Sequence, residues 1–171
     1  MRRVRYSVAT SLDGYIAGPS GEIDWIVMDP DMDFAARMAA FDIVLMGRKT
    51  YKVAVEHGPG AVMPGMVTYV FSRTLSQDDC PGVTVSSEPA ETVATLKNQP
   101  GKDIWLFGGG SLFKGLLDLG LVDTVEVTII PSVLGDGVPL LPAGSKLAKL
   151  KLTNHQVYEK TGTVALEYEI A

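Results

Sequence analysis

The chain has 171 residues, of which 46% are hydrophobic and 20% charged, and its formal net charge is −5 at pH 7. This length and composition predict one globular domain, residues 1–171, and exclude disordered and fibrous classes. The negative charge argues against general nucleic-acid binding, because such proteins need a basic surface that displaces counterions from phosphates.

Cysteine and histidine are too scarce for a disulfide framework or a metal centre. The single Cys80 has no partner within the chain, and there are two histidines in total. We therefore expect no bound metal and a reducing compartment. Polar residues interrupt the apolar residues that follow Met1, and no apolar run approaches the roughly 20 residues that cross a bilayer. These features predict a cytoplasmic protein without membrane contact.

The first part of the chain shows strand and helix patterns in turn. Apolar and polar residues alternate over 3–10, which predicts a strand, and the glycine-rich residues 13–21 predict a long loop. Asp31 is a candidate N-cap for a helix over Met32–Ala40. The wholly apolar run Ile43–Met46 is typical of a strand that is covered on both faces.

From residue 48 onward strands and helices continue to alternate, and the last third consists mainly of strands. The expected helices cover 48–55, 88–98 and 112–119, and the expected strands cover 67–71, 83–85, 103–107, 122–130, 149–159 and 163–170, the last two joined as a hairpin at 160–162. This order predicts an α/β fold with a mixed, mainly parallel sheet, helices on both faces and antiparallel C-terminal strands.

A basic turn follows the buried strand at 43–46. Gly47 permits close approach, Arg48 and Lys49 supply two cations, and Thr50 supplies a hydroxyl at the start of the next helix. Two cations oppose the positive end of a helix, and a bound anion would resolve that conflict. The segment therefore indicates a phosphate site. The alternative is a solvated, basic first turn of a helix.

Two further strand ends carry groups that suit phosphate. Strand 103–107 runs into a glycine triplet and a serine, Gly108, Gly109, Gly110 and Ser111, which would present backbone N–H groups at a helix start. This segment lacks the spacing of the P-loop and of the Rossmann fingerprint, and it can instead be a tight turn. Ser72 and Arg73 follow strand 67–71. Three such strand ends favour a nucleotide cofactor, because ligands of open α/β sheets bind beyond the carboxyl ends of the strands.

The ordered set of motifs carries a family resemblance over nearly the whole chain. Its markers are Ser11–Gly18, Trp25, Gly47–Tyr51, Ser72–Arg73, Gly108–Phe113, Thr128 and Leu134–Gly137. In this set the chain resembles the dihydrofolate reductase superfamily, particularly the reductase domain of the riboflavin-biosynthesis deaminase–reductase and its stand-alone relatives. The resemblance implies a three-layer αβα sandwich and NADPH as cofactor.

The resemblance also implies roles for the cofactor-binding segments. Residues 48–50 would contact the pyrophosphate and adenosine phosphates, and residues 72–73 would hold the ribose 2′-phosphate that distinguishes NADPH from NADH. Residues 108–112, ending in Leu112, would wrap the pyrophosphate from the other side. The backbone of Ala9 and Ile16 would hydrogen-bond the nicotinamide carboxamide. The protein would then supply orientation, while the cofactor supplies the hydride.

Acidic residues are the candidates for proton delivery to the substrate. Folate-reducing members carry an acid at the start of the helix after the Trp-containing loop, and Asp31 is the nearest match, with Asp29 and Asp33 as competitors. A buried carboxylate there would have a raised pKa and assist protonation. The alternative is helix capping by Asp31 and solvation of the other two. Asp13 lies in the Ser-Leu-Asp-Gly sequence typical of the riboflavin-type branch, or it serves only as a turn residue.

Three other residues are assigned to the substrate side. The resemblance places Thr128 on a central strand beneath the pterin-like site, although it can also be an ordinary strand threonine. Trp25 would shape the pocket or close the loop over the core. Phe34, on the apolar face of the helix expected at 32–40, is a further candidate for substrate binding.

The predicted function is NADPH-dependent reduction of a C=O or C=N bond in a pyrimidine- or pterin-like heterocycle. The phosphoribosylaminouracil reductase activity of riboflavin synthesis is the leading named candidate. Dihydrofolate reductase is the first alternative, and a non-catalytic NADPH-binding regulatory module is the second. Relatives in this branch commonly pair, so we expect a homodimer, with the apolar strand near Val125–Ile130 as a possible edge.

Overall fold

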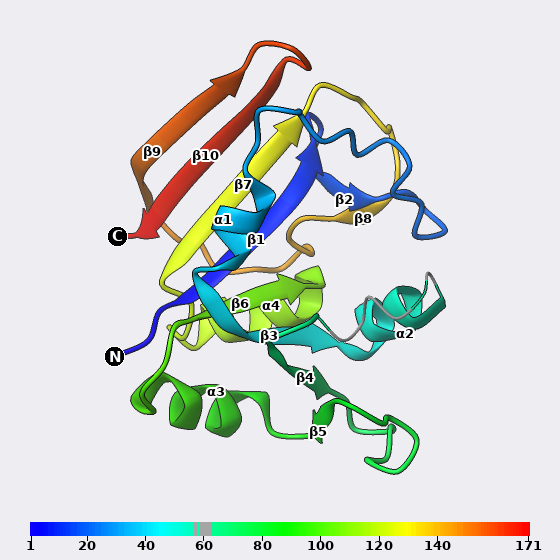
Figure 1. Cartoon of the computed structure of the whole chain (residues 1–171), viewed down its shortest axis with the longest axis vertical. Coiled ribbons are helices and arrows are strands. Elements are labelled where there is room, and N and C mark those ends of the chain that lie inside the picture. The colour runs from blue at the N-terminus through cyan, green and yellow to red at the C-terminus, as the bar shows by residue number, and fades with distance from the viewer. Residues whose placement is uncertain (57, 59–62) are drawn as a thin grey trace.

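The computed structural model describes residues 1–56, 58 and 63–171. Its centre is an eight-stranded sheet in the order β5-β4-β3-β6-β1-β7-β10-β9 (Figure 1). The strands of this sheet are β1 (Val4–Ser11), β3 (Phe41–Gly47), β4 (Val67–Phe71), β5 (Thr84–Ser86), β6 (Asp103–Gly108), β7 (Thr124–Ile130), β9 (Leu150–Tyr158) and β10 (Thr163–Ile170). The first six run parallel, and β10 pairs antiparallel with both β7 and β9.

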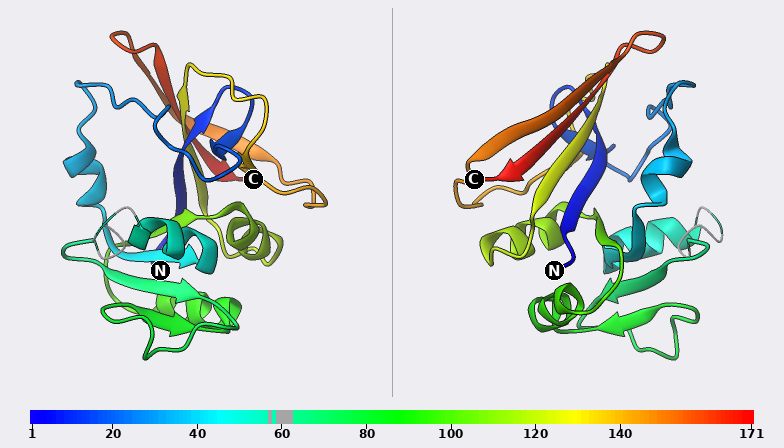
Figure 2. Two further views of the ribbon diagram at one scale, coloured as in Figure 1. Left: turned by 90° about the vertical axis from the view of Figure 1, so that its right-hand side faces the viewer. Right: turned by 60° about the vertical axis from the view of Figure 1, so that its left-hand side comes forward.

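Helices cover both faces of the sheet, as the two views of Figure 2 show. The helices are α1 (Phe34–Met38), α2 (Arg48–Glu56), α3 (Pro89–Asn98) and α4 (Gly110–Asp118). One buried cluster joins α3 and α4 to the sheet through residues such as Val93 and Phe113. The other includes Trp105 and packs against Met38 of α1 and Tyr51 of α2. The α/β class and the three-layer arrangement are confirmed.

Most elements lie where the sequence predicts them, including the hairpin that joins β9 and β10. The strands β2 (Tyr15–Ala17) and β8 (Val138–Pro139), which form a separate two-stranded sheet, were not predicted. Strands of two or three residues are too short to show a period, and their pairing joins segments more than 120 residues apart. Part of the long loop expected at 13–21 is therefore a strand.

The start of α1 differs from the prediction. The N-cap is Asp33, whose Oδ1 accepts a hydrogen bond from the backbone N–H of Ala36 at 2.8 Å. A capping side chain accepts from the N–H two or three residues further along the chain, and Asp31 is too far from the first helical turn to do so. The prediction that Asp31 caps this helix was wrong.

Strand β7 is not an edge of the sheet. It lies between β1 and β10, and Thr128 pairs with Ala9 on one side and Ala165 on the other. The C-terminal hairpin adds two strands outside β7, so the edge strands are β5 and β9. The expectation of an edge at Val125–Ile130 was therefore wrong.

The sheet order brings the three phosphate-compatible segments together. Strands β4, β3 and β6 are adjacent and parallel, so they all end at the same side of the sheet. Gly47 is in register with Phe71 at the end of β4, and its neighbour Met46 is in register with Gly108 at the end of β6. The chain that follows each strand therefore opens onto one shared space.

Candidate active site

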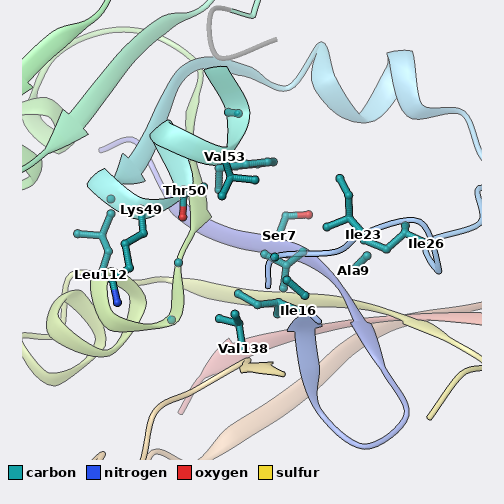
Figure 3. A pocket seen from close by; sticks show the side chains of 18 of the residues that line it. Ser7, Ala9, Ile16, Ile23, Ile26, Lys49, Thr50, Val53, Leu112 and Val138 are labelled. Carbon is teal, nitrogen blue, oxygen red and sulfur yellow. The ribbon is translucent and has the colours of Figure 1, made fainter. Parts of the chain in front are cut away.

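A cavity of about 1140 Å³ lies beyond the carboxyl ends of the central strands. Figure 3 shows Lys49, Thr50 and Leu112 at one end, and Ile23 and Ile26 at the other. The first group comes from the starts of α2 and α4, whereas the second comes from the loop between β2 and α1. We call these the phosphate end and the apolar end.

The phosphate end depends on close backbone approach. A Cβ atom on Gly109 would lie 3.3 Å from the hydroxyl oxygen of Thr50, and one on Gly47 would lie 4.0 Å from the backbone nitrogen of Gly109. The turns after β3 and β6 are therefore in near contact, and both line the cavity together with Ser111 and Leu112. The two turns therefore adjoin each other at the phosphate end of the cavity.

The turn after β4 completes this end. The Oγ atom of Ser72 accepts hydrogen bonds from the backbone N–H groups of Thr74 at 3.1 Å and Leu75 at 3.0 Å. These bonds fix the turn and occupy the oxygen as an acceptor, and the Thr74 hydroxyl lies 3.4 Å from the same oxygen. Arg73 follows it, is exposed and also lines the cavity.

The charges on the lining have one sign. Arg37, Arg48, Lys49 and Arg73 line the cavity, and none of the described lining residues is an aspartate or glutamate. The whole protein nevertheless carries a net charge of −5. A cleft lined by one sign of charge concentrates ligands of the opposite sign. The arrangement therefore favours an anionic ligand.

Arg37 is a cavity residue that the sequence analysis missed. Its Nη2 donates to Ser7 Oγ at 3.2 Å and lies 3.9 Å from Oε2 of the buried Glu126. Both oxygens of Glu126 already accept from Arg5, at 2.6 and 3.0 Å. Glu126 therefore attracts the Arg37 guanidinium electrostatically, without a direct hydrogen bond to it. A lone arginine on a predicted helix gave no signal, because its partners come from strands β1 and β7.

The structure places most of the other predicted residues in the cavity lining and leaves four outside it: Gly108, Trp25 and the candidate acids Asp13 and Asp31. Ala9, Ile16, Phe34, Gly110 and Thr128 line the cavity, and Thr128 is buried. Gly108 and Trp25 are not among the lining residues. The indole N–H of Trp25 donates to the backbone oxygen of Glu22 at 3.0 Å, which closes the loop on itself.

Comparison with known proteins places this chain in a family. The family model described as "RibD C-terminal domain" matches residues 2–164. The chain belongs to the RibD C-terminal domain family. It is 37% identical to the uncharacterised protein YyaP of Bacillus subtilis, over 98% of this chain and 94% of that protein.

Solved structures share the fold at lower identity. One is the Thermotoga maritima diaminohydroxyphosphoribosylaminopyrimidine deaminase/5-amino-6-(5-phosphoribosylamino)uracil reductase, with a TM-score of 0.71 and 19% identity, over 99% of this chain and 57% of that one. Another is Enterococcus faecalis dihydrofolate reductase in complex with NADP(H) and RAB-propyl, with a TM-score of 0.71 and 17% identity, over 98% and 96% of the two chains. The family match confirms the predicted resemblance to the riboflavin-type reductase domain, and the two structures confirm a fold like that of dihydrofolate reductase.

Asp13 ties two loops together and does not line the cavity. Its Oδ1 accepts from the Ser11 hydroxyl at 2.6 Å and from the Leu134 N–H at 3.1 Å, and its Oδ2 accepts from the Gly135 N–H at 2.8 Å. The Ser11 hydroxyl and these backbone N–H groups hold the pKa of the Asp13 carboxyl below its ordinary value. A carboxyl group held ionised in this way is a poor proton donor.

The other candidate acids also lie outside the cavity lining. Asp31 is exposed, and its Oδ1 accepts from Lys160 Nζ at 2.6 Å. The buried Asp29 accepts from the N–H and hydroxyl of Thr161 in the β9–β10 turn, at 3.0 and 2.8 Å. Burial acts to raise the pKa of Asp29, but hydrogen bonds from the Asp31 N–H and from Thr161 outweigh it, so the pKa is lowered. With Asp33 capping α1, these acids fasten the loop to its surroundings.

The described residues hold neither a candidate metal cluster nor a membrane-spanning helix. No cluster of three or more histidine, cysteine or acidic side chains suited to a metal ion occurs among residues 1–56, 58 and 63–171. Within the same residues, no helix is long and apolar enough to cross a membrane.

Proposed function

We propose that this member of the family is an NADPH-dependent reductase of a heterocyclic C=O or C=N bond. The observation that supports the proposal most directly is the cavity at the ends of β3, β4 and β6. It combines close backbone approach with four cationic side chains and, among its described lining residues, no acidic one.

The residues of the phosphate end fit the cofactor. Arg48, Lys49 and Thr50 would hold the pyrophosphate and adenosine phosphates, opposite Gly109–Leu112, and Ser72 and Arg73 would hold the ribose 2′-phosphate. Charged donors and the N–H groups at the starts of α2 and α4 are the groups that phosphate oxygens prefer. When bound, NADPH would supply the hydride. The backbone of Ala9 and Ile16 would orient its nicotinamide ring at the apolar end.

The proton that accompanies the hydride needs a source other than a lining acid. Asp13, Asp29, Asp31 and Asp33 all accept hydrogen bonds outside the described lining. We propose that water delivers the proton, and that the hydroxyl of the buried Thr128 orients the reacting edge of the substrate. Geometry of this kind weighs against dihydrofolate, whose protonation in folate-reducing members relies on an acid in the site.

The aminouracil of riboflavin synthesis is the first named substrate to test. The Thermotoga structure carries that reductase activity in its name, and the fold is shared over 99% of this chain. Dihydrofolate is the second substrate to test. A regulatory module that binds NADPH without turnover is the alternative from another class, and the absence of an acid among the described lining residues keeps it open.

Two further proposals concern the whole protein, namely its compartment and its assembly. The buried, unpaired Cys80 suits a reducing cytoplasm. A homodimer remains our proposal, and β9 is the edge strand that the fold leaves for pairing beyond β10. Sedimentation of the purified protein tests the assembly, since a monomer at micromolar concentration would reject it.

Thermal unfolding with each nicotinamide cofactor tests the cofactor proposal. A ligand at 100 times its dissociation constant stabilises the folded state by about 2.7 kcal/mol. We expect NADPH to raise the melting temperature and NADH to have little effect at the same concentration. If neither cofactor raises it, the cofactor assignment fails. Loss of NADPH absorbance with the aminouracil or with dihydrofolate then decides between the named substrates, and binding without turnover of either substrate favours the regulatory module.

A further inference from the structure

We propose that the acceptor is a flat, mainly apolar carbonyl compound that carries one anionic group, which Arg37 recognises. This inference rests on the proposed function and names the class of its substrate. Reduction would add a hydride from NADPH and a proton from water across the C=O bond, giving an alcohol and NADP⁺. The proposal concerns the apolar end of the cavity, which the phosphate-binding groups do not use.

The apolar end is built from large side chains that remain open to solvent. Ile23, Val27, Met28 and Phe34 line the cavity and are 46–55% exposed, and Ile26, Met32 and Met38 line it as well. Figure 3 shows Ile23 and Ile26 directed toward Ser7 and Ile16 across the cavity. A contiguous exposed apolar surface of this kind marks a binding site. Its walls suit the two faces of a flat, apolar body.

The loop that carries these side chains is held in place from outside the cavity. Asp29 is bound to Thr161, and Lys160 is paired with the neighbouring Asp31. Both attachments connect the loop to the β9–β10 turn. The apolar side chains of the loop therefore face the cavity because polar side chains of the same loop are fixed on its other side. This arrangement presents an apolar wall without requiring a ligand to order it.

Arg37 is the one cation that lines the cavity away from the phosphate end, among the described residues. Ser7 Oγ accepts one of its hydrogen bonds, and the nearest carboxylate oxygen, on Glu126, is 3.9 Å away and already bound to Arg5. The guanidinium group has five N–H donors in a rigid fork that matches a carboxylate. Arg37 is therefore positioned, partly buried and supplied with donors for an anionic group.

These two features together define the ligand chemistry. A protonated base would face Arg37 with no lining acid among the described residues to balance its charge, so cationic acceptors are disfavoured. A sugar with many hydroxyl groups would leave them against isoleucine and methionine side chains, which offer no hydrogen bonds. Within the proposed reductase function, this inference therefore favours an acceptor without a sugar over the phosphoribosyl-bearing aminouracil. An aromatic carboxylate suits both features, because its ring would pack against the apolar side chains and its carboxylate would accept hydrogen bonds from Arg37.

A matched pair of probes tests the inference by binding and needs no turnover. We would titrate 2-naphthoate and its neutral amide, 2-naphthamide, into protein saturated with NADP⁺, using calorimetry. The rings are the same, so the difference in affinity reports the charge. We expect one site and at least about tenfold tighter binding of the naphthoate, as for a charge-assisted hydrogen bond in a partly buried site.

Three variants locate the binding. Arg37→Met should reduce the naphthoate affinity to that of the amide, and Arg37→Lys should retain part of the preference if the first variant is unstable. Arg3→Met is the matched control, because Arg3 pairs with Glu169 on the surface and should leave the preference unchanged. Met28→Ser should weaken the binding of both probes by a similar factor, since it removes an apolar contact and leaves the charge of Arg37 in place.

The outcomes separate the two levels of the proposal. Equal binding of the two probes, absence of binding, or a preference that persists in both Arg37 variants would overturn the inference while NADP⁺ binding leaves the proposed function intact. If NADP⁺ itself does not bind in the same instrument, the proposed function fails and this inference fails with it.

Discussion

Asp13 Oδ2 accepts a hydrogen bond from the backbone N–H of Gly135 at 2.8 Å, and this bond joins the turn after β1 to the loop after β7. The residues that follow these two turns pair as β2 and β8, and both contribute lining residues, Ile16 and Val138. An acid in the Ser-Leu-Asp-Gly sequence typical of the riboflavin-type branch therefore holds two loops together. A substitution of Asp13 would therefore affect function by changing the shape of the cavity.

The Asp13 bond predicts a pH-dependent contribution to stability. The folded-state pKa of Asp13 is lowered, so its contribution is fully present above the ordinary aspartate pKa of about 3.9 and is lost as the pH falls through the lowered value. Asp13→Asn should lower the unfolding free energy at pH 7, and the difference from the parent should shrink on acidification. Urea unfolding at several pH values measures it. Asp24→Asn, at an exposed acid, is the control, and an equal loss there would contradict the prediction.

Arg73 should decide between the two nicotinamide cofactors. If it binds the 2′-phosphate, Arg73→Ala should weaken NADPH binding between about tenfold and about hundredfold, the equivalent of about 1.5–3 kcal/mol, and leave NADH binding unchanged. Dissociation constants from cofactor fluorescence measure both. Arg3→Ala, at a surface ion pair, is the matched control. Equal weakening of NADPH and NADH by Arg73→Ala would remove Arg73 from the 2′-phosphate site.

Two glycines of α4 should respond in opposite directions to alanine. A Cβ on Gly110 would lie 2.9 Å from the backbone oxygen of Pro139 and 3.1 Å from that of Leu140, whereas a Cβ on Gly115 meets nothing within 4 Å. We expect Gly110→Ala to cost about 1–3 kcal/mol of unfolding free energy through overpacking. Gly115→Ala should gain about 0.5–1 kcal/mol, because alanine favours the helix. Chemical denaturation compares the two, and similar effects would reject this packing.

Asp31 should be dispensable for turnover. It is exposed and paired with Lys160, and exposed ion pairs contribute about 0–1 kcal/mol to stability. Asp31→Asn should change the turnover of a confirmed substrate by less than about twofold, an effect below about 0.4 kcal/mol. The matched variant is Thr128→Val, which removes the hydroxyl in the cavity and should slow turnover more. A large loss of rate in Asp31→Asn with unchanged NADPH binding would restore it as the proton donor.

The sequence by itself determined most of the elements and grouped the segments of the phosphate end. Local patterns fix those features, since the apolar run at Ile43–Met46 requires a covered strand and the glycines and cations after each strand act close to where they stand in the chain. Once strands alternate with helices, their carboxyl ends meet on one side of a sheet, so Arg48, Ser72 and Gly109 could be grouped without coordinates.

Only the tertiary structure decided the substrate side. As aspartates near the expected substrate site, Asp13, Asp29 and Asp31 are candidate catalytic acids on sequence grounds. Their hydrogen-bond partners lie more than 120 residues away in the chain, and are Gly135, Thr161 and Lys160 respectively. The same holds for Arg37, which gains its setting from Ser7 and Glu126. Whether an acid donates a proton or fastens a loop depends on what its oxygens accept from. That is set by long-range packing, which a local pattern does not encode.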